Sequence, residues 1–151
     1  MGTISNSHIH NNVDLVNKLN NLRVDHDFIL VSYDVTQLFT RVPVNDLLVY
    51  LEEELENHDL PLPTATIIDL IKLCVLESYF VFNGKYYLQN FGMAMGNPIS
   101  PILSNLYMEF FETKLLPSIL PHKVTWFRYL DDILCIWPVN DDPSIFLSQL
   151  N

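Results

Sequence analysis

Two adjacent carboxylates, Asp131 and Asp132, interrupt a segment whose aromatic and β-branched residues are typical of paired β-strands. Apolar strands avoid unpaired charge, so an acidic pair in this position suits a bound cation. An Asp pair at a hairpin tip is also ordinary turn chemistry. A third carboxylate, Asp34, ends another apolar run, Phe28 to Tyr33. If the two strand ends are neighbours, the three carboxylates form one acidic site.

A second segment that could do chemistry is the loop from Gly92 to Pro101, where Gly, Asn and Pro precede an apolar helix. Glycine lets backbone approach a base or a sugar closely, and a helix start points free N–H groups outward. The same residue types commonly punctuate a helix start, so the loop by itself leaves both interpretations open. It is not a phosphate-binding P-loop, because the required Lys-Ser/Thr pair does not follow.

The chain is acidic, with eight Lys and Arg against 18 Asp and Glu and a formal net charge of −10. A protein that grips a phosphate backbone presents a basic surface, so this charge argues against strong nucleic-acid binding by the chain alone. Four glutamates between Glu52 and Glu56 account for part of the excess and favour a solvated helix face. At 151 residues and 49% hydrophobic content, we expect one sizeable core.

Polar or charged residues interrupt every apolar run before about 18 residues, so no membrane-spanning helix is expected. The N-terminus is polar and does not resemble a signal peptide. Cys74 and Cys135 lie in apolar runs, which favours two buried thiols over a disulfide and, with them, an intracellular location. The histidines and cysteines lack the spacing of a zinc site.

The elements that must position these residues are helices and hairpin-forming strands. Asn83-Gly84 between two aromatic runs predicts a hairpin, because a type I′ turn needs positive φ at both central positions. The expected elements are a helix over 13–22, a buried strand over 28–33, a helix over 43–55, a helix over 64–76 capped by Thr64, a hairpin over 79–88, a helix that starts at Pro98 or Pro101 and continues over 103–116, a hairpin over 124–137 with the acidic pair at its tip, and a short helix opened by Asp141, Asp142 and Pro143. Hairpins without β-α-β crossovers predict an α+β fold, an antiparallel sheet with helices packed on one face.

Three segments, in this order, resemble motifs A, B and C of reverse transcriptases. They are Ser32 to Pro43, Gln89 to Met108, and Tyr129-Leu130-Asp131-Asp132. The sequences LFTRVP, GMAMGNPISPILSNLYMEFFE and WFRYLDDILCIW are most similar to those of the polymerases of Penelope-like retroelements, with telomerase and group II intron polymerases as more distant relatives. The resemblance covers roughly residues 28 to 150 and implies a palm-like sheet and RNA-directed DNA polymerase activity.

The resemblance also implies a metal site. Asp34 and Asp131 match the principal metal-binding aspartates, Asp132 the supporting carboxylate, and the carbonyl of Val35 a further ligand. Together they would hold two Mg²⁺ ions, with Mn²⁺ as a substitute, because magnesium prefers oxygen ligands. Two such ions about 4 Å apart stabilise both the attacking and the leaving oxygens of nucleotidyl transfer.

Further residues match the family's nucleotide and template pocket, and Phe39 among them matches the aromatic floor that excludes a sugar 2′-hydroxyl. The expected substrate-binding residues are Val35, Phe39, Gln89, Gly92, Met95, Gly96, Ser100, Pro101 and Tyr129. The implied partners are an RNA template, a DNA primer and deoxynucleoside triphosphates, with no membrane and an undetermined oligomeric state. Arg41 is the one cation near motif A, and its role stays open. In a complete element the protein would be nuclear.

Relatives also carry a motif D, a thumb, basic fingers and, in complete Penelope-like proteins, a GIY-YIG endonuclease, none of which is recognisable in these residues. We therefore expect a partial reverse transcriptase domain, with residues 1–27 as a remnant of the fingers and residues 28–151 as the palm. One alternative is a catalytically inactive retroelement remnant or scaffold that keeps the palm fold. Another is a two-metal nuclease, which would share the carboxylates but give no reason for Phe39 or the Gly92 loop.

Overall fold

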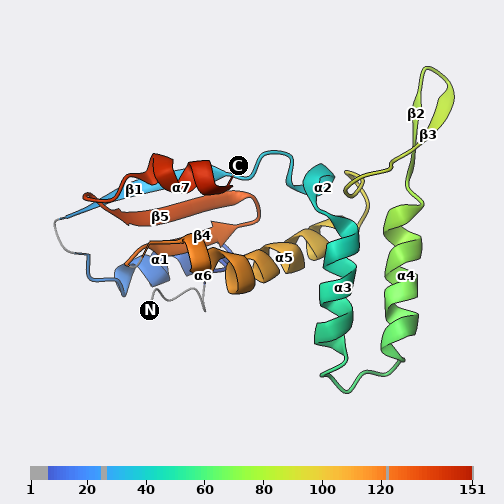
Figure 1. Cartoon of the computed structure of the whole chain (residues 1–151), viewed down its shortest axis with the longest axis horizontal. Helices are drawn as coiled ribbons and strands as arrows, with labels where there is room; N and C mark the ends of the chain where they lie inside the picture. Colours follow the sequence, from blue (N-terminus) through green and yellow to red (C-terminus); the bar gives the residue numbers. More distant parts are fainter. Residues whose placement is uncertain (1–6, 25–26, 122, 151) are drawn as a thin grey trace. The chain divides into compact units, whose positions relative to one another are not determined.

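The structure is a computed structural model that describes residues 7–24, 27–121 and 123–150 (Figure 1). The elements, in chain order, are α1 (Asn12–Asn20), β1 (Phe28–Asp34), α2 (Leu38–Arg41), α3 (Val44–Leu55), α4 (Thr64–Leu76), β2 (Tyr79–Phe82), β3 (Lys85–Leu88), α5 (Ser100–Phe110), the π-helix η1 (Phe111–Leu115), α6 (Leu116–Ile119), β4 (Thr125–Tyr129), β5 (Asp132–Pro138) and α7 (Pro143–Leu150). They fall into two compact units, one drawn from Met1–Thr36 with Phe111–Asn151 and the other being Gln37–Phe110.

The first unit is built on a three-stranded antiparallel sheet with the order β1-β5-β4. β4 and β5 form the hairpin that the sequence predicts, and β1 pairs along the other side of β5. The chain before α1 extends the sheet at the free edge of β4. There the N–H of Arg128 donates to the carbonyl of Ser7, and the N–H of Ile9 donates to the carbonyl of Arg128, both at 2.8 Å.

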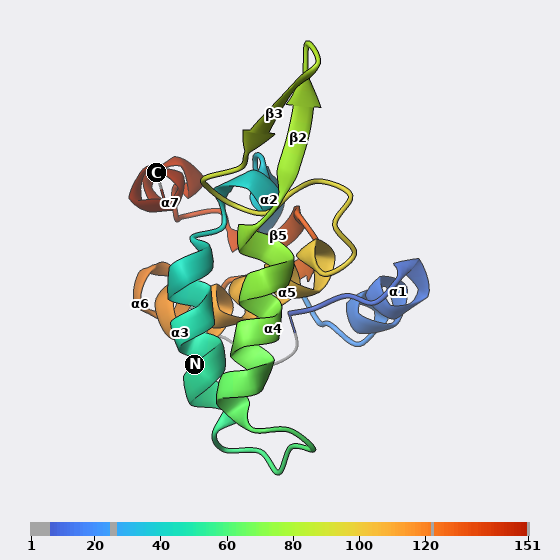
Figure 2. The same ribbon diagram turned by 90° about the vertical axis from the view of Figure 1, so that its right-hand side faces the viewer.

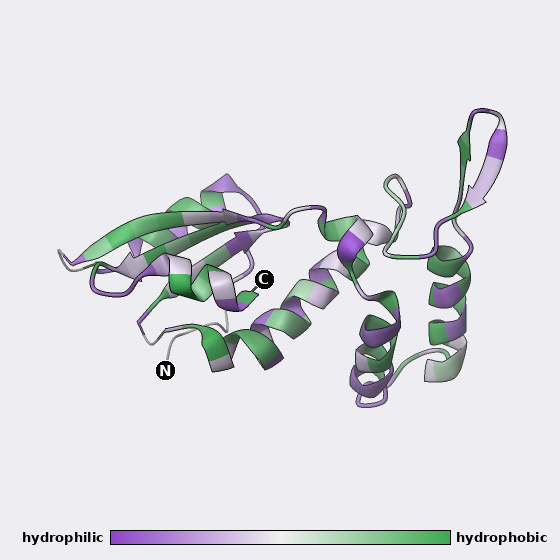
Figure 3. Ribbon diagram, turned by 45° about the horizontal axis from the view of Figure 1, so that its top comes forward, coloured by the Kyte–Doolittle hydropathy of each residue, from purple (hydrophilic) through white to green (hydrophobic). Residues whose placement is uncertain are grey.

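The strands of the sheet are largely hydrophobic along their length (Figure 3). Because successive side chains point to opposite faces, both faces of the sheet carry apolar residues. One face carries Trp126, Cys135 and Trp137, which pack with residues of η1, α6 and α7, including Phe146. The opposite face carries Phe127 and Ile136, which pack with Ile9 and the apolar side of α1. The predicted α+β architecture of an antiparallel sheet with helices is confirmed. The helices lie on both faces of the sheet and not on one as expected, because the amphipathic α1 covers the second face.

The expectation of a buried strand over 28–33 is wrong. β1 is an edge strand that pairs only with β5 in this sheet, and its residues are exposed or half-buried. Leu30, for example, is 70% exposed. The short apolar run indicated a strand correctly, but periodicity in a run of this length does not reveal whether both faces are covered.

The second unit pairs α3 with α4, which run side by side (Figure 2). Leu47, Leu48 and Leu51 of α3 and Ile68 and Val75 of α4 are buried. α4 begins at Thr64 after Pro63, and no side chain caps its N-terminus, so the predicted Thr64 cap is wrong.

The predicted hairpin over 79–88 is present as β2 and β3. Asn83 and Gly84 have φ of 50° and 71°, as a type I′ turn requires. Cys135 is a buried free thiol as expected, whereas Cys74 is free but exposed, which contradicts that prediction. No helix in the described ranges is long and apolar enough to cross a membrane.

Candidate functional site

Asp34 and Asp132 lie opposite each other in the sheet. Asp34 is the last residue of β1 and Asp132 the first of β5, and the two are direct partners in the antiparallel register. Tyr129, the last residue of β4, is the partner of Asp132 on its other side. Because cross-strand partners point to the same face, these three side chains form a row at one end of the sheet. All three are exposed.

Asp131 belongs to the two-residue turn that connects β4 to β5. Leu130, the other turn residue, has a φ of 55°, a left-handed conformation that is uncommon for a bulky side chain. The N–H of Val35 donates a 3.0 Å hydrogen bond to the carbonyl of Asp131. The structure therefore brings the backbones of Asp34, Val35, Asp131 and Asp132 to the same sheet end, as the sequence predicts.

The position of Asp34 is supported from the opposite face by its neighbour Tyr33. The Tyr33 ring packs against Trp126, Trp137 and Phe146, with ring centroids 5.8 to 6.4 Å apart. Its hydroxyl donates a 3.4 Å hydrogen bond to the carbonyl of Pro143. Burial raises the pKa of Tyr33. An anchored Tyr33 fixes the end of β1, so the Asp34 backbone is held by core packing.

The described residues contain no group of three or more His, Cys, Asp or Glu side chains arranged to hold a metal ion. The row provides two carboxylates, Asp34 and Asp132, with Asp131 in the adjoining turn. Carboxylate and carbonyl oxygens are the ligands that Mg²⁺ prefers. The donor chemistry at this sheet end therefore fits magnesium, although the carboxylates are not gathered into a three-residue cluster.

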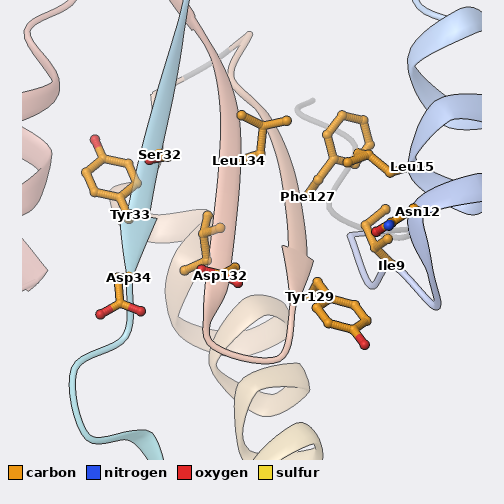
Figure 4. Close-up of a pocket in the computed structure, with 11 residues that line it drawn as sticks. Ile9, Asn12, Leu15, Ser32, Tyr33, Asp34, Phe127, Tyr129, Asp132 and Leu134 are labelled. Carbon is orange, nitrogen blue, oxygen red and sulfur yellow. The ribbon is translucent and has the colours of Figure 1, made fainter.

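A pocket of about 410 Å³ adjoins the acidic row (Figure 4). Asp34, Asp132 and Tyr129 line it together with Ser32 of β1, and Asn12 of α1 contributes from across the pocket. The volume lies in the range of about 300–1,000 Å³ that is usual for small-ligand sites. The sequence did not single out Asn12 or Ser32. Ser32 begins the segment that resembles motif A, but neither Ser32 nor Asn12 was given a role, because a single Asn or Ser near a helix or strand does not by itself indicate a binding residue.

In the second unit, Phe39 and the loop before α5 are bonded to each other. The N–H of Met93 donates a 2.7 Å hydrogen bond to the carbonyl of Phe39. Phe39 lies in α2, a single helical turn preceded by Gln37 at a φ of 58°, and is half-buried. Arg41, at the end of the same turn, is exposed, and its Nε donates to Oε1 of Gln37 at 3.4 Å. A backbone hydrogen bond therefore joins the segment that resembles motif A to the segment that resembles motif B.

Gly92 is required by this contact. It is buried, its φ is 66°, and a Cβ at this position would collide with the carbonyl group and the Cα of Thr40. The sequence indicated that a glycine here lets backbone approach a base or sugar. In the structure the close neighbour is the chain's own backbone at Thr40.

The remaining predicted residues of motif B fall into two groups. Some make hydrogen bonds within the loop, and the others are exposed. Ser100 is buried, and its hydroxyl donates to the carbonyl of Ala94 at 3.0 Å, which ties the helix start to the loop. Gln89 is half-buried, and its amide donates to the carbonyl of Phe91 at 2.9 Å. Met95, Gly96 and Pro101 are exposed and available to a ligand.

Sequence reasoning missed a buried ion pair beneath the acidic row. Arg128 is fully buried and Glu112 is 2% exposed, and their closest approach is 2.6 Å between Nε and Oε1. A charged residue inside an apolar strand and another inside an apolar helix were the available signals. Their pairing could not be predicted from the sequence, because the two residues are 16 positions apart and Glu112 is the buried residue of a π-helix.

Comparisons with known proteins identify the family and the fold of the chain. The family model described as reverse transcriptase (RNA-dependent DNA polymerase) matches residues 3–149. No curated protein sequence matches the chain. Among solved structures, telomerase from Candida tropicalis, truncated from its C-terminal domain, has a TM-score of 0.72 at 13% identity and matches 95% of this chain. Telomerase from Candida albicans, in complex with a TWJ fragment of telomeric RNA, has a TM-score of 0.71 at 14% identity and also matches 95%.

A viral polymerase shares the fold more distantly. The Sicinivirus 3Dpol RNA-dependent RNA polymerase has a TM-score of 0.54 at 19% identity and matches 80% of this chain. The chain spans 32%, 28% and 26% of the lengths of these three structures. At such identities the likeness concerns the fold, while the family follows from the match over nearly the whole sequence. Because the family model matches residues 3–149, the chain belongs to the reverse transcriptase (RNA-dependent DNA polymerase) family.

Proposed function

We propose that this chain is the palm of an RNA-directed DNA polymerase from a Penelope-like element. The observation that carries the proposal is the pairing of Asp34 with Asp132, with Asp131 in the adjoining turn bonded to Val35. These carboxylates come from two strands far apart in sequence and meet at a pocket. The Penelope-like assignment is supported by the wording of the three motifs, LFTRVP above all.

In this proposal Asp34, Asp131, Asp132 and the carbonyl of Val35 hold two Mg²⁺ ions, with Mn²⁺ as a substitute. When bound, the ions lower the pKa of the primer 3′-hydroxyl and neutralise charge on the leaving pyrophosphate. The protein's part is to fix the carboxylates at one sheet end and to orient the reacting groups. The exposed ring of Tyr129, beside Asp132, supports the primer terminus at the pocket.

The proposed substrates are deoxynucleoside triphosphates, added to a DNA primer on an RNA template. Phe39 acts as the floor beneath the sugar, a role that its match to motif A supports. The hydrogen bond from the Met93 N–H to the Phe39 carbonyl holds its backbone in place. The exposed Met95, Gly96 and Pro101 contact the nucleotide or template, while Gln89, Gly92 and Ser100 shape the loop that presents them. In a complete element this work takes place in the nucleus, which imaging of a tagged protein tests.

Primer extension tests the proposal against its two alternatives. A completed protein, in which this palm is joined to fingers and thumb, is given a labelled DNA primer on an RNA template with deoxynucleotides and Mg²⁺. Extension that disappears in Asp34→Asn supports the polymerase. An intact, folded protein without extension supports the inactive remnant. Degradation of the template without extension, also lost in Asp34→Asn, supports the two-metal nuclease.

The flanking gene provides a separate test of the Penelope-like origin. We expect codons for a motif D, a thumb and a GIY-YIG endonuclease downstream of this palm. A polymerase gene with a different accompanying domain would assign the palm to another branch of the family without affecting the proposed chemistry.

A further inference from the structure

Glu112 and Arg128 form a buried charged pair next to Trp126 of β4. Glu112 Oε1 accepts from Arg128 Nε at 2.6 Å and from Trp126 Nε1 at 3.0 Å, and Oε2 accepts from Arg128 Nη2 at 3.3 Å and from Ser7 Oγ at 2.8 Å. Each carboxylate oxygen of Glu112 therefore accepts two hydrogen bonds. A buried ion pair contributes little net stability relative to well-packed apolar residues, so stability alone does not account for its presence here.

The pair reaches the acidic turn through Arg128. Nη1 of Arg128 donates a 3.2 Å hydrogen bond to the carbonyl of Leu130, the residue that immediately precedes Asp131. Leu130 is in the left-handed region at a φ of 55°. A bulky residue persists there only when its surroundings hold it, and such residues gather at functional sites. The guanidinium is a rigid planar fork, so its two hydrogen bonds to Glu112 orient Nη1 toward the turn.

The position of Glu112 depends on the π-helix η1, which interrupts the regular helix after α5. Glu112 is buried, whereas Thr113, Lys114 and Leu115 in the same turn are exposed. π-Helical turns occur often at functional sites, because one extra residue per turn changes which side chain faces inward. Here that side chain is the carboxylate that receives Arg128.

We infer that Arg128, held by Glu112, is a positioning residue that sets the Leu130-Asp131 turn in the conformation the metal site requires. The chain of contacts runs from Glu112 through the guanidinium to the Leu130 carbonyl, and from the Asp131 carbonyl to the N–H of Val35. It links the π-helix to the strand end that carries Asp34. This inference rests on the proposed metal site for its purpose, but the positioning itself is measurable without it.

The test is amide hydrogen exchange, read by NMR on the full 151-residue chain. The Val35 amide reports the turn, because it donates to Asp131, and the Cys135 amide reports the middle of the sheet. Arg128→Lys keeps a charge for Glu112 but loses the fork. We expect exchange at Val35 to rise at least tenfold relative to Cys135. Glu112→Gln, which keeps the shape and removes the charge, is expected to raise the same ratio severalfold.

The matched control is Ser7→Ala, which removes one donor to Glu112 and leaves the Arg128 contacts to Glu112 and Leu130. It should leave the Val35 to Cys135 ratio within twofold of the original protein. If Arg128→Lys and Glu112→Gln change this ratio no more than Ser7→Ala does, the ion pair is only a structural part of the core and the inference is wrong.

Mn²⁺ binding separates this inference from the proposed function. Titration of the same proteins with Mn²⁺, followed by paramagnetic broadening, should give an affinity at least tenfold weaker for Arg128→Lys and unchanged for Ser7→Ala. An affinity that does not weaken in Arg128→Lys while the exchange ratio rises overturns the link between the turn and the metal site. If Asp34→Asn leaves Mn²⁺ binding intact, the proposed metal site fails, and the exchange ratio still decides the positioning.

Discussion

The N–H of Val35 donates a 3.0 Å hydrogen bond to the carbonyl of Asp131, and this bond joins the ends of two sequence motifs that lie far apart in the chain. It continues the β1–β5 pairing by one step beyond Asp34 and Asp132. The bond brings a turn residue of motif C to the exit of motif A. The acidic end of the sheet is therefore held by backbone contacts, and its carboxylates are left exposed for a ligand.

Asp34→Asn or Asp131→Asn should each abolish Mg²⁺-dependent nucleotide addition in a completed protein. Each change removes a charge that would hold a metal and stabilise the transition state. Asp132→Asn should reduce activity less, since the resemblance gives it the supporting role. Single-turnover primer extension measures the loss. Full activity in either of the first two variants would contradict the proposed site.

Phe39→Val in a completed polymerase should raise ribonucleotide incorporation relative to deoxyribonucleotide by well over tenfold, a change of more than about 1.4 kcal/mol, because it opens the space under the sugar. The two incorporation rates are measured side by side, together with a melting temperature. If Phe39 only packs in the core, the variant loses stability and total activity but keeps the ribo-to-deoxy ratio.

Gly92→Ala should destabilise the 151-residue chain by about 3 kcal/mol, since the new Cβ meets the Thr40 backbone and a residue with positive φ becomes strained. Gly84→Ala is the matched control, because its φ is also positive but no atom lies within 4 Å of the added Cβ. It should lose only about 1 kcal/mol. Urea unfolding measures both, and equal losses would rule out the contact as the cause.

The 151-residue chain alone should bind primer-template weakly and extend it little. Its net charge is −10, and phosphate contacts supply most of the non-specific affinity for nucleic acid. Restoring fingers and thumb should increase both binding and extension. Fluorescence anisotropy at physiological salt provides the measurement, and tight binding by the chain alone would refute the expectation.

Burial raises the pKa of the Cys135 thiol from 9.0 to about 12. Because the folded pKa lies above the unfolded one, the neutral thiol stabilises the fold fully below pH 9, and this contribution falls as the pH rises from 9 toward 12. The free energy of unfolding of Cys135→Ala should therefore fall less steeply than that of the original protein as the pH rises over this range. Iodoacetamide at pH 8 should modify the exposed Cys74 and spare Cys135 until the chain unfolds, as mass spectrometry can check.

Local sequence patterns determined most of the elements and the identity of the acidic residues. Asn83-Gly84 specified its hairpin because both positions need positive φ, which is a property of two residues. The apolar runs around Asp34 and Asp131 indicated strands because side-chain alternation and β-branching are local features. The motif wording indicated the family, which the match over residues 3–149 confirms.

Only the tertiary structure decided how these elements meet. The pairing of Asp34 with Asp132 depends on strand register, and a shift of one residue would turn every side chain to the other face. The burial of Arg128 against Glu112, and the collision that makes Gly92 necessary at Thr40, depend on backbone paths that converge in space. A sequence records which residues are able to pair, whereas long-range packing selects the pairs, because each one forms only when the whole core around it is in place.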